Sequence, residues 1–166
     1  MILTQGWQDM ELFLIRHAKT NPTSHSGSDF DRKLMPRGLI QCRDLCAHLQ
    51  ALNVEIGTVL CSSAERTRQT FLEIRSAANC PVHYMDDIYL ADRQVLLKKI
   101  NLVRHNKNLM LIGHNDGLSE LASYLTGIDI YFKTGMLFIL EFNGDSWEEL
   151  SAQTATLRGS YRSECR

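Results

Sequence analysis

Short apolar runs alternate with amphipathic segments along this chain of 166 residues, and this alternation constrains the fold more than any other feature. Apolar runs predict strands at 11–15, 57–61, 82–85, 108–113 and 135–142. Apolar residues at helical spacing predict helices over 37–52, 63–78, 92–103 and 116–127. Strands that alternate with helices indicate an α/β fold, in which a mostly parallel sheet has helices on both faces as a three-layer α/β/α sandwich.

The length suits one domain with one sizeable core, so we expect a single domain over 1–166. Residues 1–9 resemble a short N-terminal tail. The C-terminal residues 159–166 are consistent with an edge strand or with a loose tail, and the sequence does not decide between them. At the helix ends, Ser63 and Asp116 are expected N-caps, and Gly127 is expected just past the end of the fourth helix.

Charge and hydropathy exclude several classes of protein. The formal net charge of −1 argues against a general nucleic-acid binder, which usually carries a basic excess. No apolar run approaches the roughly 18–20 residues that span a bilayer, and the first ten residues lack the pattern of a signal peptide. We therefore expect a cytoplasmic protein that binds neither nucleic acid nor membrane.

The five cysteines are an odd number, which favours reduced thiols in a cytoplasm. Cys42 and Cys46 share one face of a predicted helix, but no further ligands lie near them in the sequence. We expect these two thiols to pack in the core, and Cys61 at the end of a strand likewise. A redox or metal protein built on the cysteines lacks the required spacing.

Unusual side chains follow three of the predicted strands. Arg16 and His17 end the first strand, Arg66 lies just inside the helix after the second, and His114 follows Gly113 after the fourth. In a parallel sheet the carboxyl ends of the strands meet at one edge, where ligands bind. Two arginines and two histidines are therefore expected to converge in one pocket.

Arg66 is in the first turn of its helix, where the positive end of the helix dipole disfavours a cation. A bound anion would remove this conflict, and the neighbouring Glu65 could also soften it. Arg68, two residues on, is expected to be a solvated charge. A phosphoryl group suits the predicted pocket best, because arginine matches phosphate oxygens and histidine can accept the group covalently.

Three stretches, "LFLIRHAKT", "LCSSAERTRQT" and "LMLIGHNDGLSEL", resemble the histidine phosphatase superfamily, also called phosphoglycerate mutase-like. The segments "FDRKLMPRGLIQC" and "DDIYLAD" are similar to its SixA-type phosphohistidine phosphatases. The resemblance implies that His17 is the nucleophile that becomes phosphorylated and that Arg16 and Arg66 bind the phosphate. It implies that His114 completes the pocket. It also implies a phosphatase that needs no metal or other cofactor.

One departure from the larger relatives is the lack of a confident general acid. Asp86, Asp87 and Asp92 lie in the right region, but each is better interpreted as a turn residue or helix cap. A missing acid suits a substrate with a good leaving group, such as phosphohistidine. Phosphohistidine on a protein is therefore the favoured substrate. The alternatives are a small phosphate ester or anhydride, or a non-catalytic phosphate-binding module.

Two further residues are expected near the phosphate. Lys19 lies two positions after His17, and Asn115 follows His114, so either could line the pocket and bind substrate. For Lys19, a mobile charge at the rim is the more ordinary interpretation.

Overall fold

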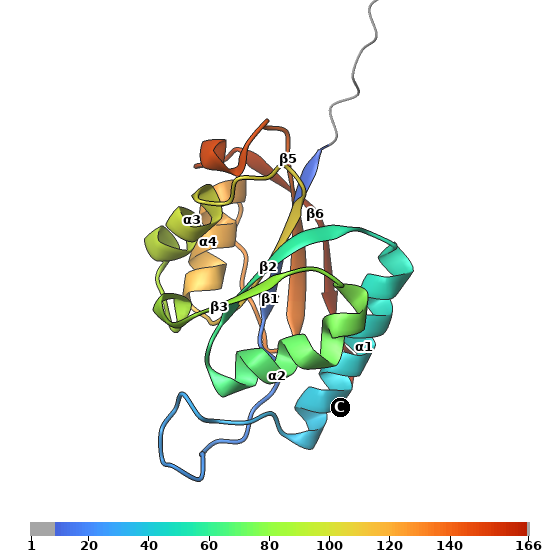
Figure 1. Cartoon of the computed structure of the whole chain (residues 1–166), viewed down its shortest axis with the longest axis vertical. Helices are drawn as coiled ribbons and strands as arrows, with labels where there is room; N and C mark the ends of the chain where they lie inside the picture. Colours follow the sequence, from blue (N-terminus) through green and yellow to red (C-terminus); the bar gives the residue numbers. More distant parts are fainter. Residues whose placement is uncertain (1–8, 166) are drawn as a thin grey trace, which may run out of the picture.

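The computed structural model describes residues 9–165, and these fold around one six-stranded sheet (Figure 1). The spatial order of the strands is β3-β2-β4-β1-β5-β6. Their bounds are β1 (Met10–Arg16), β2 (Ile56–Ser62), β3 (Val82–Met85), β4 (Asn108–Gly113), β5 (Met136–Phe142) and β6 (Ala155–Arg162). Strands β3, β2, β4 and β1 run parallel, and β5 and β6 pair antiparallel. The sheet is therefore mostly parallel, as predicted.

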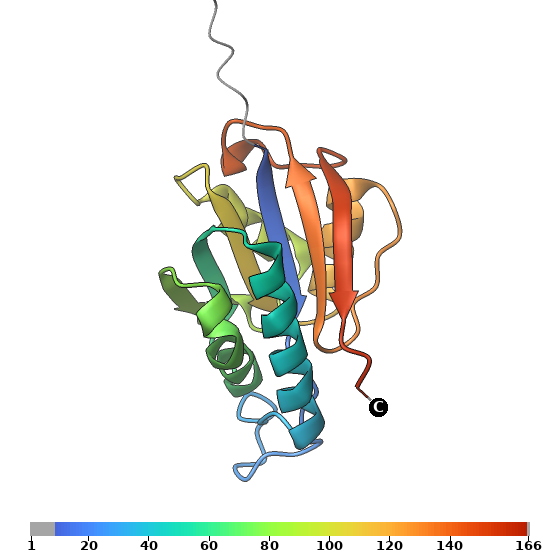
Figure 2. The ribbon, with the colours of Figure 1, turned by 90° about the vertical axis from the view of Figure 1, so that its right-hand side faces the viewer.

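Helices cover both faces of the sheet, which confirms the predicted three-layer sandwich (Figure 2). On one face lie α1 (Pro36–Leu52) and α2 (Glu65–Ile74), and on the other lie α3 (Arg93–Asn101) and α4 (Gly117–Thr126). Three short 3₁₀ turns are η1 (Arg75–Ala77), η2 (Asp86–Ile88) and η3 (Trp147–Glu149). Within residues 9–165, no helix has the length and apolar character needed to cross a bilayer.

The central strand β1 explains why the apolar runs are unbroken. Leu12 and Leu14 pack into the core on one side of the sheet, whereas Phe13 and Ile15 pack into the core on the other. A strand that is buried on both faces needs apolar residues at every position rather than at alternate ones.

The register of the parallel strands brings three of the predicted motifs to one edge of the sheet. Arg16 at the end of β1 lies opposite Gly113 at the end of β4, and Cys61 near the end of β2 lies opposite Ile112. The backbone N–H of His17 donates to the carbonyl of Gly113 at 3.2 Å. His17 and His114 therefore leave the sheet side by side.

One predicted helix cap is wrong, and a second is confirmed in position but lacks the capping hydrogen bond. Helix α2 begins at Glu65 with Ala64 in the N-cap position, and the Ser63 hydroxyl donates instead to the Asp86 carboxylate. Asp116 is in the N-cap position of α4, but its side chain makes no capping hydrogen bond. Gly127 ends α4 in the left-handed conformation, as expected.

The C-terminal segment is not a loose tail. Residues 159–162 belong to β6, which pairs along β5, and the Ser163 hydroxyl donates to Asp44 of α1. The end of the chain lies beside α1, where Arg37 donates to the carbonyl of Cys165 at 3.1 Å (Figure 1). The predicted N-terminal tail lies, apart from Asp9, outside the described residues.

Helix α1 starts against the loop that follows β1. A Cβ atom at Gly38 would lie 2.1 Å from the carbonyl oxygen of Lys19, which is backbone and cannot rotate away. We expect Gly38→Ala to destabilise the protein by about 1–3 kcal/mol, because α1 must move off the loop. Thermal or denaturant unfolding measures this loss. Gly159→Ala is the control, since a Cβ there meets no atom within 4 Å, and equal effects of the two changes would refute the prediction.

Candidate active site

The four residues predicted from the strand ends meet at one edge of the sheet. The ring centroids of His17 and His114 lie 5.3 Å apart. His17 is 7% exposed, while Arg66 and His114 are each 3% exposed, and Arg16 is half-buried. The site is thus a largely desolvated cluster of two imidazoles and two guanidiniums.

His17 presents one ring nitrogen for chemistry. Its Nδ1 lies 2.8 Å from the carbonyl oxygen of Ala18. Since a carbonyl can only accept, Nδ1 carries the proton and Nε2 keeps a free lone pair. The pKa of His17 is lowered from 6.5 to about 3, mainly by burial and also by the charges of Arg66 and Arg16, against the opposing effect of the Ala18 carbonyl. The imidazole is therefore neutral at physiological pH.

His114 is oriented by Ser62. The Nε2 atom of His114 lies 2.7 Å from the Ser62 hydroxyl, and that hydroxyl oxygen accepts from the Ala64 N–H at 3.3 Å. We assign the hydroxyl proton to the bond with Nε2, which puts the His114 proton on Nδ1. Burial, and next the proximity of His17, lowers the pKa of His114 well below its usual value. His114 is therefore a neutral donor through Nδ1.

The two arginines are anchored by their terminal nitrogens. Arg16 donates through Nη1 to the carbonyl of Phe132 at 2.9 Å. Arg66 donates through Nη1 to the carbonyl of Asp29 at 2.7 Å and through Nη2 to its carboxylate at 3.0 Å. In both side chains the Nε atom remains outside these bonds.

Buried side-chain nitrogen and oxygen atoms without a partner are confined to this cluster in the part of the chain that the structure describes. They are Arg16 Nε, Arg66 Nε and His114 Nδ1. A buried donor without a partner costs roughly 1–3 kcal/mol, and three of them belong to four neighbouring residues. This arrangement is suited to an anion that accepts several hydrogen bonds.

A threonine links the loop that begins at His17 to α2. The Thr70 hydroxyl accepts from the Ala18 N–H at 3.1 Å and donates to the carbonyl of Arg66 at 2.7 Å. On the other side of the loop, the Gly135 N–H donates to the carbonyl of His17 at 3.0 Å. These bonds hold His17 and Arg66 at a defined separation.

Lys19 and Asn115 differ in how they are held. The side chain of Lys19 is exposed, and its backbone N–H donates to Gln41. Asn115 donates to the carbonyl of Phe132 at 3.3 Å and accepts from Ser119 at 2.7 Å. Phe132 also anchors Arg16, so Asn115 supports the site through Phe132. Direct substrate contact by Lys19 or Asn115 stays a prediction.

The three aspartates considered as general acids are each engaged outside the cluster. Asp86 accepts from Ser63, and Asp87 pairs with Lys99. Asp92 caps α3 by accepting from the Val95 N–H at 3.0 Å. These contacts agree with the turn and cap roles expected for them.

The sequence interpretation missed three residues beside the cluster, Asp29, Arg32 and Tyr89. Arg32 helps to lower the pKa of His17, and the Tyr89 ring meets His114 edge-on with centroids 5.4 Å apart. Arg32 and Tyr89 lie in the segments "FDRKLMPRGLIQC" and "DDIYLAD", whose resemblance to SixA-type proteins assigned them no role. Asp29 precedes the first segment, in a stretch whose turn-forming composition indicates only a surface loop.

Arg68 is not the solvated charge that was expected. Its guanidinium lies 4.1 Å from the ring centroid of Tyr84, and its Nε donates to the carbonyl of Ser63 at 2.8 Å. It helps to hold the turn between β2 and α2.

Metal binding is not supported within residues 9–165, where no group of three or more His, Cys, Asp or Glu side chains could hold an ion. Cys42 and Cys46 are buried, as expected. Burial raises the pKa of Cys42 to about 12, and it also raises the pKa of Cys61. Cys42 and Cys61 are both unreactive core thiols.

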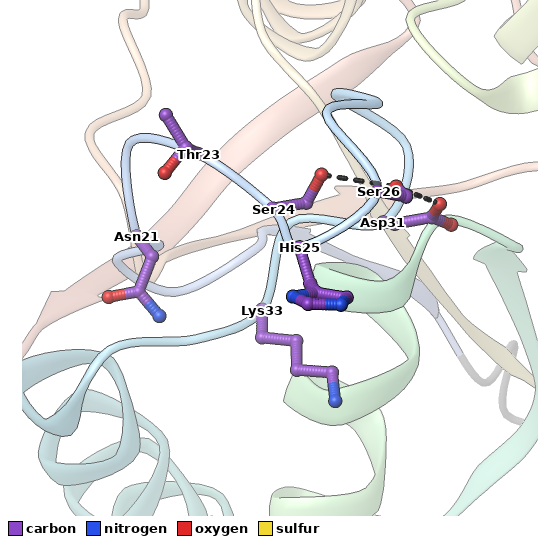
Figure 3. A pocket seen from close by; sticks show the side chains of 7 residues that line it. All are labelled: Asn21, Thr23, Ser24, His25, Ser26, Asp31 and Lys33. Carbon is purple, nitrogen blue, oxygen red and sulfur yellow. Dashed lines mark hydrogen bonds between the residues drawn. The ribbon is translucent and has the colours of Figure 1, made fainter.

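A hollow lies within the loop that follows His17 (Figure 3). It is lined by Asn21, Thr23, Ser24, His25, Ser26, Asp31 and Lys33. None of the four clustered residues lines it, so it is a feature of the loop rather than of the candidate chemistry.

Comparison with known proteins agrees with this geometry. The model of the histidine phosphatase superfamily (branch 1) matches residues 12–89. An uncharacterized protein of Mycobacterium leprae is 31% identical over 157 residues, which cover 86% of this chain and 96% of that protein. The chain belongs to the histidine phosphatase superfamily. An uncharacterized chloroplastic protein of Arabidopsis thaliana is 30% identical over 85% of this chain and 70% of its own.

Solved structures share the fold of this histidine phosphatase superfamily member. A candidate SixA phosphohistidine phosphatase of Nakamurella multipartitia aligns with a TM-score of 0.82 and 24% identity, over 93% of this chain and 96% of its own. The protein histidine phosphatase SixA complexed with tungstate aligns with a TM-score of 0.79 and 21% identity, over 92% and 97%. At these identities the likeness concerns the fold.

The buried neutral histidines predict an acid-labile fold. The pKa of His17 is lower in the folded state, about 3, than its ordinary value of 6.5. Its contribution to stability is therefore complete above that ordinary value and is lost as the pH falls toward the folded pKa. At about pH 4.5 the loss is on the order of 2 kcal/mol relative to neutral pH.

Denaturant unfolding of the wild type and of His17→Gln at a series of pH values measures this loss. As the pH falls, the free energy of unfolding should decrease more for the wild type than for His17→Gln. His25→Gln, at an exposed loop position, is the control and should follow the wild type. A constant gap between wild type and His17→Gln would contradict the lowered pKa.

Proposed function

We propose that this protein is a phosphatase that acts through a phosphohistidine intermediate on His17 and that its substrate is phosphohistidine on a protein. The observation that carries the proposal is the set of buried, unpartnered donors on Arg16, Arg66 and His114, which belong to the same cluster as a neutral His17.

The donors suit a tetrahedral oxyanion. Arg16 Nε, Arg66 Nε and His114 Nδ1 supply three hydrogen bonds, and the two guanidiniums supply positive charge in a desolvated site. Phosphoryl transfer needs mainly such positioning and charge stabilisation. The complex of SixA with tungstate, a tetrahedral oxyanion, supports this choice of ligand for the shared fold.

The reaction has two steps in this proposal. The Nε2 lone pair of His17 forms a bond to phosphorus while the bond from phosphorus to the leaving nitrogen breaks, and the leaving imidazole takes up a proton from solvent water. Water then attacks the phosphoryl group on His17, which releases inorganic phosphate and restores neutral His17. The hydrogen bond from Nδ1 to the Ala18 carbonyl keeps the nucleophilic nitrogen unprotonated in both steps.

Phosphohistidine is favoured because, within residues 9–165, each aspartate weighed as a proton donor is engaged in another contact. Asp86, Asp87 and Asp92 are engaged elsewhere. Asp29 contacts Arg66, but the Tyr89 hydroxyl and the Arg32 guanidinium hold the pKa of its carboxyl far below the ordinary value, so it remains ionised. An alkoxide leaving group would need a proton donor on the enzyme. An imidazole leaves readily once its ring nitrogen has been protonated, and solvent can supply that proton. The structural likeness to SixA supports the same substrate class.

The decisive experiment compares two substrates with two forms of the protein. Wild type and His17→Ala are each incubated with a phosphohistidine-bearing protein and with an aryl phosphate. We expect the wild type to hydrolyse phosphohistidine faster and His17→Ala to hydrolyse neither. Acid-labile, base-stable phosphate on wild-type protein would identify the intermediate. Equal activity of His17→Ala would refute the proposal, and a preference for aryl phosphate would refute the substrate class.

The same assay with a chelator tests the proposed chemistry. Because the phosphoryl group is held by side-chain donors alone, we expect a chelator to leave the rate unchanged. Loss of activity in chelator, restored by a divalent cation, would contradict this mechanism.

Ser62→Ala tests the orientation of His114. Without the hydroxyl, nothing selects the Nδ1–H form of the imidazole, so we expect kcat to fall by about tenfold. This is less than the roughly 10²–10³-fold cost of removing a donor, because the His114 ring remains. Ser63→Ala removes a neighbouring hydroxyl that is bonded to Asp86 instead, and it should retain most of the activity. Full activity of Ser62→Ala would contradict the assigned role of Ser62.

A further inference from the structure

We propose that Asp29 is the positioning residue for Arg66: its carbonyl and carboxylate hold both terminal nitrogens of the guanidinium, so that Nε faces the phosphoryl site. This inference rests on the proposed function, since it names the residue that makes one of the phosphate arginines effective.

The contacts between the two residues restrain the guanidinium at two points. Nη1 of Arg66 donates to the main-chain oxygen of Asp29 at 2.7 Å, and Nη2 donates to its Oδ2 at 3.0 Å. Arg66 is almost fully buried, whereas the Asp29 side chain is 45% exposed. Two bonds, one from each terminal nitrogen, restrain rotation of the guanidinium about its long axis. The one nitrogen without a partner is Nε.

Asp29 is itself held by two other side chains. The Tyr89 hydroxyl donates to Oδ2 at 2.6 Å, and Arg32 Nη1 donates to Oδ1 at 2.9 Å. Each carboxylate oxygen of Asp29 therefore has a hydrogen bond to a residue other than Arg66, which fixes the carboxylate in place. The hydrogen bonds from Tyr89 and Arg32 strongly lower the pKa of the carboxyl, so the contact persists as an ion pair over the pH range of an ordinary assay.

The other arginine shows the same design with a different anchor. Arg16 gives Nη1 to the Phe132 carbonyl and also keeps an unpartnered, buried Nε. Arg16 is therefore held by one terminal nitrogen and Arg66 by both, and each leaves Nε free. The anchor of Arg16 is main chain, which no substitution removes, whereas the anchor of Arg66 includes a side chain that can be tested.

The loop that carries Asp29 is attached to α2 at further points. The Glu65 N–H donates to the carbonyl of Phe30 at 3.0 Å, and the Leu34 N–H donates to the side chain of Gln69 at 2.8 Å. Phe30 packs edge-on against Tyr89, with centroids 5.0 Å apart. These contacts make the loop a fixed support, and Asp29 is the point at which that support reaches the guanidinium.

Charge alone predicts the opposite effect of removing Asp29. The carboxylate is negative, so Asp29→Asn raises the positive potential around the site and, by Coulomb's law, favours an anion. Positioning predicts weaker binding, because the guanidinium loses one of its two anchors and its Nε is no longer held in one direction. The sign of the change therefore separates the two effects.

The experiment measures the dissociation constant of tungstate and the steady-state constants for wild type, Asp29→Asn and Asp29→Asn in an Arg66→Ala background. We expect Asp29→Asn to weaken tungstate binding and to lower kcat/KM by about tenfold each, the size of one charge-assisted hydrogen bond. In the Arg66→Ala background the same change should have no further effect, because Asp29 acts through Arg66.

Asp31→Asn is the matched control. It removes the same charge from the same loop, at an exposed residue that bonds Ser26 rather than an arginine, and it should leave both quantities unchanged. Tyr89→Phe, which removes one donor to Asp29 and keeps the ring, should give a smaller loss of the same sign. It keeps the test decisive if Asp29→Asn folds poorly.

The outcomes are distinct from those that test the proposed function. Tungstate binding by Asp29→Asn that equals or exceeds that of the wild type would overturn the inference and leave the proposed phosphatase intact. An equal loss with and without Arg66 would overturn it as well. A wild type that neither binds tungstate nor hydrolyses either substrate would overturn the proposed function and this inference with it.

Discussion

The candidate site depends on the parallel pairing of β4 with its two neighbours. Because β1 and β2 both run parallel to β4, their carboxyl ends lie at one edge of the sheet. Arg16 and His17 leave β1 beside Gly113, and α2 starts from the end of β2. A shift of one residue in either register would turn these side chains away from one another, since neighbouring residues of a strand face opposite sides.

Desolvation gives this arrangement its chemical character. Burial and two guanidiniums keep His17 neutral, and the Ala18 carbonyl decides which of its nitrogens carries the proton. The same burial leaves three donors without a partner. The donors are stable in this position because protein contacts hold the rest of each side chain, namely Phe132 behind Arg16, Asp29 behind Arg66 and Ser62 behind His114.

Local patterns predicted most of the fold, and long-range contacts decided where those predictions failed. The strands at 82–85 and 108–113 were predicted with their observed bounds, since short runs buried in a sheet carry a strong apolar signal. Ser63 was wrongly expected to cap α2, because its hydroxyl binds Asp86, 23 residues away. The C-terminal residues could be assigned to a strand only from the structure, in which β6 pairs antiparallel with β5.

The sequence by itself determined the class of fold, the four clustered residues and the family, because each motif follows an apolar strand and parallel strands end at one edge. Only the tertiary structure decided the state of those residues: which nitrogen of each histidine is protonated, and which atoms anchor the arginines. It also revealed Asp29, whose bond to Arg66 joins residues 37 apart in a loop without periodicity. Hydrogen-bond direction and desolvation arise from neighbours brought together by folding, and no local pattern encodes them.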